Sequence, residues 1–170
     1  MIDPSELRDG YVIRQAADSD VDAACGIAVQ AWQRIHESFT DIMGQEMHDD
    51  LSPSWEEKKA GQIRSHFSEN PTWMLVVEQE KVGVVAFLTF RIDKERSLGT
   101  IGNNAVDPRS QGSGIGTAMY GVLLDLFRRE GLKYATVQTG LDEGHALARR
   151  AYEKAGFDVR REDVTYYKKL

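Results

Sequence analysis

A glycine-rich turn at residues 112–116 carries the clearest chemical signal in this chain. It follows an extended run that ends at Val106, and Pro108 closes that run because proline has no N–H to donate to a sheet. The three glycines allow a sharp turn without Cβ clashes, and apolar residues recur at helical spacing from Ile115 onward. The first N–H groups of a helix lack intrahelical partners and carry partial positive charge, so the turn is suited to a phosphate or pyrophosphate group.

Two familiar phosphate-binding loops do not match the turn. A P-loop requires G-x-x-x-x-G-K-[ST], and no Lys-Ser or Lys-Thr pair follows these glycines. The dinucleotide fingerprint requires G-x-G-x-x-G after the first strand, whereas this turn reads G-x-G-x-G, has Thr117 in place of the last glycine, and lies beyond residue 100. A nucleotide-binding module is therefore disfavoured. A plain helix start with spare glycines remains an alternative for the turn alone.

A second segment, His145 to Phe157, places a tyrosine in a short helical pattern. It reads HALARRAYEKAGF, and its apolar residues fall at helical spacing around Tyr152. Gly156 suits the position that ends a helix. Taken alone, Tyr152 is more simply interpreted as a half-buried core tyrosine with its hydroxyl at the rim.

Together the two segments resemble the GNAT superfamily of acyl-CoA-dependent N-acetyltransferases. The pattern V-x-P-x-x-Q-x-x-G-x-G runs from Val106 to Gly116, and A-x-x-x-Y-E-K-x-G-F runs from Ala148 to Phe157. The resemblance covers most of the chain, because the order of elements also fits. It implies acetyl-CoA as co-substrate, no metal, and Tyr152 as the thiol-facing catalytic residue. The cofactor-binding residues that it implies are Asn104, Ala105, Val106, Gln111, Gly112, Ser113, Gly114, Ile115, Gly116, Thr117, His145 and Ala148.

His145 stands where the family often has asparagine, seven residues before the tyrosine. We favour a contact between His145 and the pantetheine or pyrophosphate of the cofactor. The alternative is a general base, which would require His145 to point toward the acceptor side. Three arginines also flank the motifs and could face phosphates, but each is more simply interpreted as a solvated surface charge: Arg109, Arg149 and Arg150.

The activity implied by the resemblance is transfer of an acetyl group from acetyl-CoA to a primary amine, by direct attack in a ternary complex. A thiol of pKa ~8.5 and a phenol of pKa ~10 are close enough for Tyr152 to donate its proton to the leaving sulfur. By family analogy, a backbone N–H near Asn104 or Ala105 would stabilise the charge on the carbonyl oxygen. A non-catalytic acyl-CoA-binding or sensor domain is the alternative, although such a domain has little need of a thiol-facing acid.

The sequence supplies no obvious general base. Many relatives have a glutamate on the strand before the glycine turn, and residues 98–106 contain no carboxylate. Asn103 can orient the acceptor but cannot take its proton, and the same holds for Gln138 on the next strand. His36 and Glu37 at the end of the first helix are candidates for the acceptor side, with an ordinary polar surface as the alternative.

The missing base bears on the choice of acceptor. Freeing a lysine-type amine of pKa ~10.4 at pH 7.4 costs roughly 4 kcal/mol, and freeing an α-amine of pKa ~8 costs under about 1 kcal/mol. We therefore predict a small-molecule or peptide α-amine, or an aryl amine, rather than a protein lysine.

Composition narrows the remaining classes. The chain has 170 residues, a formal net charge of −6 and a mean hydropathy of −0.44, which predict one globular domain over residues 1–170. Nucleic-acid binding is disfavoured because a phosphate backbone requires a basic surface. With no apolar run near about 18 residues and no signal segment at the start, we predict a cytoplasmic protein without a membrane partner. Cys25 fits a small core residue, and Trp32, Trp55 and Tyr166 leave a homodimer open.

The elements that would position these residues predict an α/β (α+β) fold. Strands are expected over 11–16, 98–106 and 134–139, with one hairpin from 73–78 and 82–90 and a closing hairpin from 157–161 and 164–168. Helices are expected after a cap at Asp18 or Ser19 as far as Ile35, from a Ser54–Glu57 capping box to Phe67, over 115–129, and from His145. Residues 39–52 are expected to be irregular.

This order of elements predicts a mixed, mostly antiparallel sheet with helices on both faces. The resemblance further implies splayed central strands. The gap would open between the strand ending at Val106 and the strand ending near Thr139, and the pantetheine arm would lie in it.

Overall fold

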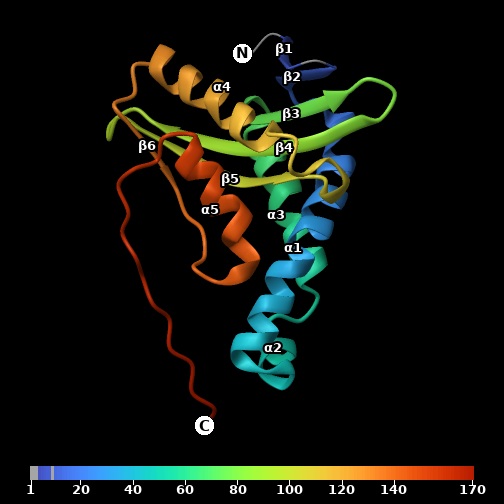
Figure 1. The fold of residues 1–170 in the computed structure, drawn as a ribbon, viewed down its shortest axis with the longest axis vertical. Helices are drawn as coiled ribbons and strands as arrows, with labels where there is room; N and C mark the ends of the chain where they lie inside the picture. Colours follow the sequence, from blue (N-terminus) through green and yellow to red (C-terminus); the bar gives the residue numbers. More distant parts are fainter. Residues whose placement is uncertain (1–3, 9) are drawn as a thin grey trace.

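The computed structural model describes residues 4–8 and 10–170, which form a mixed sheet with helices on both faces (Figure 1). The sheet has six strands in the order β1-β2-β3-β4-β5-β6, and every neighbouring pair is antiparallel except the parallel pair β5 and β6. The strands are β1 (Ser5–Arg8), β2 (Tyr11–Gln15), β3 (Met74–Gln79), β4 (Gly83–Asp93), β5 (Leu98–Val106) and β6 (Tyr134–Val137). The α-helices are α1 (Val21–Met43), α2 (Gln45–Leu51), α3 (Trp55–Glu69), α4 (Ile115–Arg129) and α5 (Ala146–Lys154). The predicted fold class is confirmed.

Strand alternation divides the core into two layers, one on each face of the sheet. In β3, Leu75 and Val77 point to one face and Met74 and Val76 to the other, because successive side chains of a strand alternate. The first layer includes Met119, Leu123 and Phe127 of α4 and Tyr152 of α5. The second includes Ala24 and Ala28 of α1 and Ile63 of α3. Both faces are covered, which explains why β3 and β4 are almost continuously apolar.

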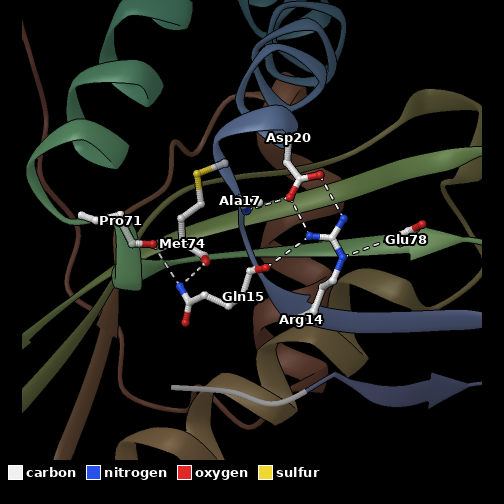
Figure 2. Close-up of polar contacts among 7 residues, drawn as sticks. All are labelled: Arg14, Gln15, Ala17, Asp20, Pro71, Met74 and Glu78. Carbon is white, nitrogen blue, oxygen red and sulfur yellow. Dashed lines mark hydrogen bonds and ion pairs between the residues drawn. The ribbon is translucent and has the colours of Figure 1, made fainter.

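A part-buried ion pair fixes the start of α1 against the sheet (Figure 2). Arg14 of β2 donates to both carboxylate oxygens of Asp20, at 2.6 and 2.9 Å, and to Glu78 of β3 at 3.0 Å. Asp20 also accepts the backbone N–H of Ala17 at 2.8 Å. The hydrogen bonds from Arg14 lower the pKa of the Asp20 carboxyl. This one carboxylate therefore links the strand, the connecting turn and the first helix.

Several predicted elements appear with small shifts at their ends. β5 and α4 coincide with the predicted ranges, and β3 and β4 form the predicted hairpin. β6 ends at Val137, two residues before the predicted end. The prediction lacks β1, because its four residues, SELR, show no apolar alternation.

Three expectations near α1 and α3 are wrong. Residues 39–52 are largely helical, because the segment holds helix-forming residues and no proline, and Gly44 at φ 83° separates α1 from α2. Ser54 precedes α3 but is left-handed at φ 50° and makes no side-chain cap, so the capping box does not form. At α1 the N-cap residue is Asp20, which makes no side-chain cap bond, and its carboxylate instead engages Arg14 and Ala17.

The predicted closing hairpin is also absent. Residues 155–170 contain no strand, and in Figure 1 the segment after α5 runs away from the sheet to the C-terminus. Two arginines of this tail pair with neighbours along the chain, Arg160 with Glu162 and Arg161 with Asp163, whereas Lys169 pairs with Glu46 of α2. None of these pairs joins two strands, as a hairpin requires.

Candidate active site

The sheet opens between β5 and β6. The two parallel strands pair as far as Ile101 and Val137 and then part, because β6 ends while β5 continues to Val106. On its other side, β5 is irregular opposite Thr89 of β4, whose hydroxyl donates to the carbonyl of Asn103 at 3.1 Å. An irregularity of this kind bends a strand and increases its twist. The splayed central strands are thus confirmed, and the far part of β5 has one edge without a strand partner.

A cavity of about 1530 Å³ occupies this opening. It extends from the glycine turn, past the end of β5 and Tyr152, to α1 and α3. The volume exceeds the roughly 300–1,000 Å³ of ordinary small-molecule sites, so a long ligand and a second substrate can share it. The predicted site residues that line it are Asn103, Asn104, Ala105, Val106, Gln111, Gly112, Ser113, Gly114, Ile115, Gly116, Thr117, Gln138, His145, Ala148 and Tyr152.

His36 and Glu37 are not brought to this cavity. They border a separate hollow of about 580 Å³, beside α2 and the start of α3. His36 stacks on Trp55 with ring centroids 3.9 Å apart, and its Nδ1 lies 2.9 Å from Nε2 of His48. Burial and the neighbouring His48 lower the pKa of His36 to about 4. The structure therefore separates this pair from the glycine turn and Tyr152.

The glycine turn leads into α4 through Gly114, which is left-handed at φ 83° and ψ 3°. No side chain caps this helix, so its first N–H groups face outward from the turn without a capping partner. A Cβ built on Gly114 would lie 2.8 Å from Nη1 of Arg8, which places a guanidinium of β1 beside the turn. A helix N-terminus with an adjacent arginine suits a diphosphate group.

Side-chain hydrogen bonds stabilise the segment between β5 and the glycine turn. Gln111 donates from Nε2 to the carbonyl of Val106 at 3.1 Å. Asp107 accepts from the backbone N–H of Arg109 at 2.9 Å and from its guanidinium at 2.6 Å, and these hydrogen bonds lower the pKa of the Asp107 carboxyl. The guanidinium of Arg109 therefore forms an ion pair with Asp107.

Tyr152, Tyr120 and Asn104 converge from α5, α4 and β5. Tyr120 donates to Oδ1 of Asn104 at 2.7 Å, and Nδ2 of Asn104 donates to the hydroxyl of Tyr152 at 3.1 Å. Both tyrosines are nearly buried, with 6% of Tyr152 and 4% of Tyr120 exposed. Burial raises the pKa of both phenols, so both keep their protons at neutral pH. The Tyr152 hydroxyl also lies 3.3 Å from Oδ1 of Asn104 and can donate to it, so the phenolic proton either bonds to Asn104 or turns toward the cavity.

His145 is held by the segment that precedes α5. Its Nδ1 lies 2.6 Å from Oδ2 of Asp142, and its ring centroid lies 6.1 Å from that of Phe39 on α1. The guanidinium of Arg149 donates to the carbonyls of Gly140 and Asp142 at 2.7 and 2.6 Å. Arg149 therefore braces this segment from within, and Nε2 is the ring nitrogen of His145 not engaged by Asp142.

Lys59 of α3 forms the wall of the cavity opposite Tyr152. Its Nζ donates to Oδ1 of Asn103 at 3.1 Å and lies 4.1 Å from the centre of the Trp32 ring. Burial lowers the pKa of Lys59 to about 8. The alternation of β5 directs Asn103 toward α1 and α3 and Asn104 toward α4 and α5, and both line the opening.

Sequence reasoning missed Arg8, Tyr120, Asp142 and Lys59. Arg8 and Tyr120 reach the site only through tertiary packing. A signal did exist for Asp142, which stands three residues before His145 as a cap would. Lys59 stands four residues before Ile63 on the inward stripe of α3, where a lysine is unusual.

Among the described residues, 4–8 and 10–170, no group of three or more His, Cys, Asp or Glu residues is arranged to hold a metal ion. None of the helices in that part of the chain has the length and apolar character that crossing a bilayer requires.

Residues 32–157 match the sequence model of the acetyltransferase (GNAT) family, so the chain belongs to the GNAT family of acetyltransferases. Similar solved structures include PaiA N-acetyltransferase from Thermoplasma acidophilum in complex with coenzyme A, with 14% identity, 90% of this chain and 92% of that chain covered, and a TM-score of 0.71. Ard1 from Thermoplasma volcanium has 20% identity, coverage of 89% and 85%, and a TM-score of 0.66. The ribosomal-protein-S18-alanine N-acetyltransferase of Escherichia coli has 19% identity, coverage of 89% and 79%, and a TM-score of 0.62. No curated protein sequence matches the chain.

Proposed function

We propose that this chain is an acetyl-CoA-dependent N-acetyltransferase with a primary amine as acceptor, a small-molecule or peptide α-amine being favoured over a protein lysine. One observation carries the proposal: a single cavity joins the uncapped start of α4 to the buried, protonated hydroxyl of Tyr152. Membership of the GNAT family supports the same activity, and the similar PaiA structure holds coenzyme A.

The cavity residues fit a coenzyme A thioester. The N–H groups at the start of α4 and the guanidinium of Arg8 would hold the diphosphate. The open edge of β5 near Ala105 would meet the amides of the pantetheine arm. Oγ1 of Thr139 is buried beside the cavity and has no hydrogen-bond partner among the described residues, so it can serve a polar ligand. When bound, the cofactor supplies an activated acetyl group.

Tyr152 would act as the acid of the reaction. The neutral acceptor amine forms a bond from nitrogen to the acetyl carbon, and the carbon–sulfur bond breaks with its electron pair remaining on sulfur. Tyr152 donates its phenolic proton to that sulfur. The surplus proton on the acceptor nitrogen leaves to solvent, and solvent returns a proton to Tyr152. A backbone N–H near Asn104 or Ala105 would stabilise the charge on the carbonyl oxygen.

Neither carboxylate among the described lining residues is free to act as a base, which favours a weakly basic acceptor. Among the lining residues, Asp142 is engaged by His145 at 2.6 Å, and Asp163 lies on the tail and pairs with Arg161 at 3.1 Å. A site without a free carboxylate does better with an amine that is already partly neutral at pH 7.4. The difference between an α-amine and a lysine amine, roughly 3 kcal/mol, is large enough to determine the acceptor.

The test is release of free thiol from acetyl-CoA over a panel of amines. We expect release that depends on the amine, with kcat/KM for a peptide α-amine or an arylamine at least about tenfold above that for a lysine side chain in a peptide with a blocked N-terminus. A preference for the lysine peptide would contradict the acceptor assignment. Thermal stabilisation by acetyl-CoA without amine-dependent release would instead indicate a non-catalytic acyl-CoA-binding domain.

A further inference from the structure

A half-buried lysine faces the acceptor side of the cavity without an acidic partner among its observed contacts. Nζ of Lys59 donates to Oδ1 of Asn103 at 3.1 Å and to Oε1 of Gln62 at 3.2 Å, and it lies over the Trp32 ring. Each of these groups is neutral. Lys59, Trp32 and Asn103 all line the cavity.

The position of Lys59 relates it directly to the point of acyl transfer. Asn103, which binds Lys59, and Asn104, which binds Tyr152, are consecutive in β5, so their Cα atoms are about 3.8 Å apart. Their side chains leave the strand on opposite faces. Lys59 and Tyr152 therefore flank the same point of the opened sheet from its two sides.

Lys59 keeps much of its positive charge although the groups it contacts are neutral. Burial lowers its pKa to about 8, so at pH 7.4 a large part of the side chain is still in the ammonium form. Buried charges in proteins are normally paired. Arg14 shows the usual arrangement in this chain, since its partly exposed guanidinium contacts the carboxylates of both Asp20 and Glu78.

We propose that Lys59 binds a carboxylate carried by the amine acceptor, so that the substrate is an amino acid or another amine that also bears a carboxylate. The inference rests on the proposed acetyltransferase function and specifies its acceptor. A carboxylate would complete the pairing that the neutral partners of Lys59 leave open. The same positive charge disfavours the ammonium form of the acceptor, which helps a site that has no free carboxylate base.

The experiment compares acceptors that differ only in charge. Alanine and phenylalanine are each assayed beside their amides, so the two members of each pair differ by an α-carboxylate. Aspartic acid α-amide and asparagine α-amide form a further pair, which differs by a side-chain carboxylate. Comparing the two types of pair shows which carboxylate Lys59 binds. The measured quantity is the ratio of kcat/KM for the acid to kcat/KM for its uncharged match, in the wild type and in Lys59→Met. Because the wild type and Lys59→Met are assayed with the same amines, the effect of amine pKa cancels when their ratios are compared.

We expect the acid-to-amide ratio to fall at least about tenfold in Lys59→Met for one of the two pair types, with turnover of the amides retained. Lys59→Arg should keep most of the ratio because it keeps the positive charge. Lys58→Met is the matched control, since Lys58 is exposed on the same helix, and it should behave as the wild type.

Other results would overturn the inference. Equal ratios in the wild type and Lys59→Met, with amines still acetylated, would reject the acceptor assignment and leave the acetyltransferase function intact. A changed KM for acetyl-CoA with every acceptor affected equally would assign Lys59 to the cofactor instead. Absence of thiol release with all amines would reject the proposed function itself.

A binding measurement on the wild type keeps the test decisive if Lys59→Met does not fold. With coenzyme A present, the acid should bind at least about tenfold more tightly than its uncharged match in calorimetry, either for N-acetylalanine beside N-acetylalaninamide or for N-acetylaspartic acid α-amide beside N-acetylasparagine α-amide. Equal affinities within both pairs would overturn the inference.

Discussion

Replacement of Tyr152 by phenylalanine tests the proposed chemistry with little disturbance of the fold. The ring would keep its packing against Tyr120, whose centroid is 4.9 Å away. Asn104 would lose one partner but keep the hydroxyl of Tyr120 at 2.7 Å. The free energy of unfolding should therefore fall by only about 1 kcal/mol, the usual net value of one hydrogen bond.

The effect on catalysis should be much larger than the effect on stability. A positioned acid contributes about 10²–10⁴-fold, and a thiolate of pKa ~8.5 leaves fairly well unaided, so the low end of that range applies. We expect kcat to fall about 10²-fold in Tyr152→Phe, or roughly 2.7 kcal/mol of barrier. The KM for acetyl-CoA should change less than about threefold, because the diphosphate contacts lie at the other end of the cavity.

Steady-state thiol release from pH 7 to 9, together with thermal unfolding, measures both effects. Burial raises the pKa of Tyr152 above its ordinary value of 10, so wild-type kcat with an acceptor that has no carboxylate should rise with the neutral fraction of the amine and show no decline up to pH 9. Tyr134→Phe is the control, since Tyr134 is 67% exposed and does not line the cavity. A Tyr152→Phe variant with kcat within twofold of the wild type would refute the role of the acid.

Three further substitutions probe the turn, the ion pair and His145. Gly114→Ala should lower the melting temperature and weaken acetyl-CoA binding several-fold by calorimetry, because a left-handed alanine costs about 1–2 kcal/mol and its Cβ would crowd Arg8. Asp20→Asn should reduce the free energy of unfolding by about 2 kcal/mol in urea at pH 7, because Arg14 loses a charged partner. Since the folded pKa of Asp20 is lowered, this difference should be fully present above about pH 4 and vanish as the pH falls through the folded pKa. His145→Asn should change the KM for acetyl-CoA with kcat and its pH profile retained, and a large kcat loss with a displaced profile would identify His145 as a general base.

The sequence signals for the proposed cofactor half of the site are local. A strand, a proline, a glycine turn and a helix follow one another within about two dozen residues, and each has its own signal in residue type or spacing. Alternation and helical periodicity also placed β3, β4, β5 and α4. The prediction that the two motifs form one site came from the family resemblance, and residues of both motifs line the cavity.

The acceptor half was harder to predict because it depends on packing between distant segments. Lys59 meets Asn103 across 44 positions of sequence, and Arg8 reaches Gly114 from an edge strand that has no apolar pattern. His36 and Glu37 followed from their place near the end of a short helix, whereas α1 continues to Met43 and turns them toward another hollow. In the longer helix, Ile35 and Phe39 line the cavity while His36 and Glu37 lie on another face.

The parting of β5 and β6 has a consequence for the unliganded protein. A bare strand edge is ordinarily a template on which other polypeptides can add. Here the turn at Glu143–His145 packs against Ile35 and Arg34 of α1, beside the opening. We expect an extended ligand in the cavity to lie along that edge and take up its hydrogen-bonding groups. Amide hydrogens of residues 102–106 that point away from β4 should thus exchange quickly with deuterium in the empty protein and slowly once the groove is filled.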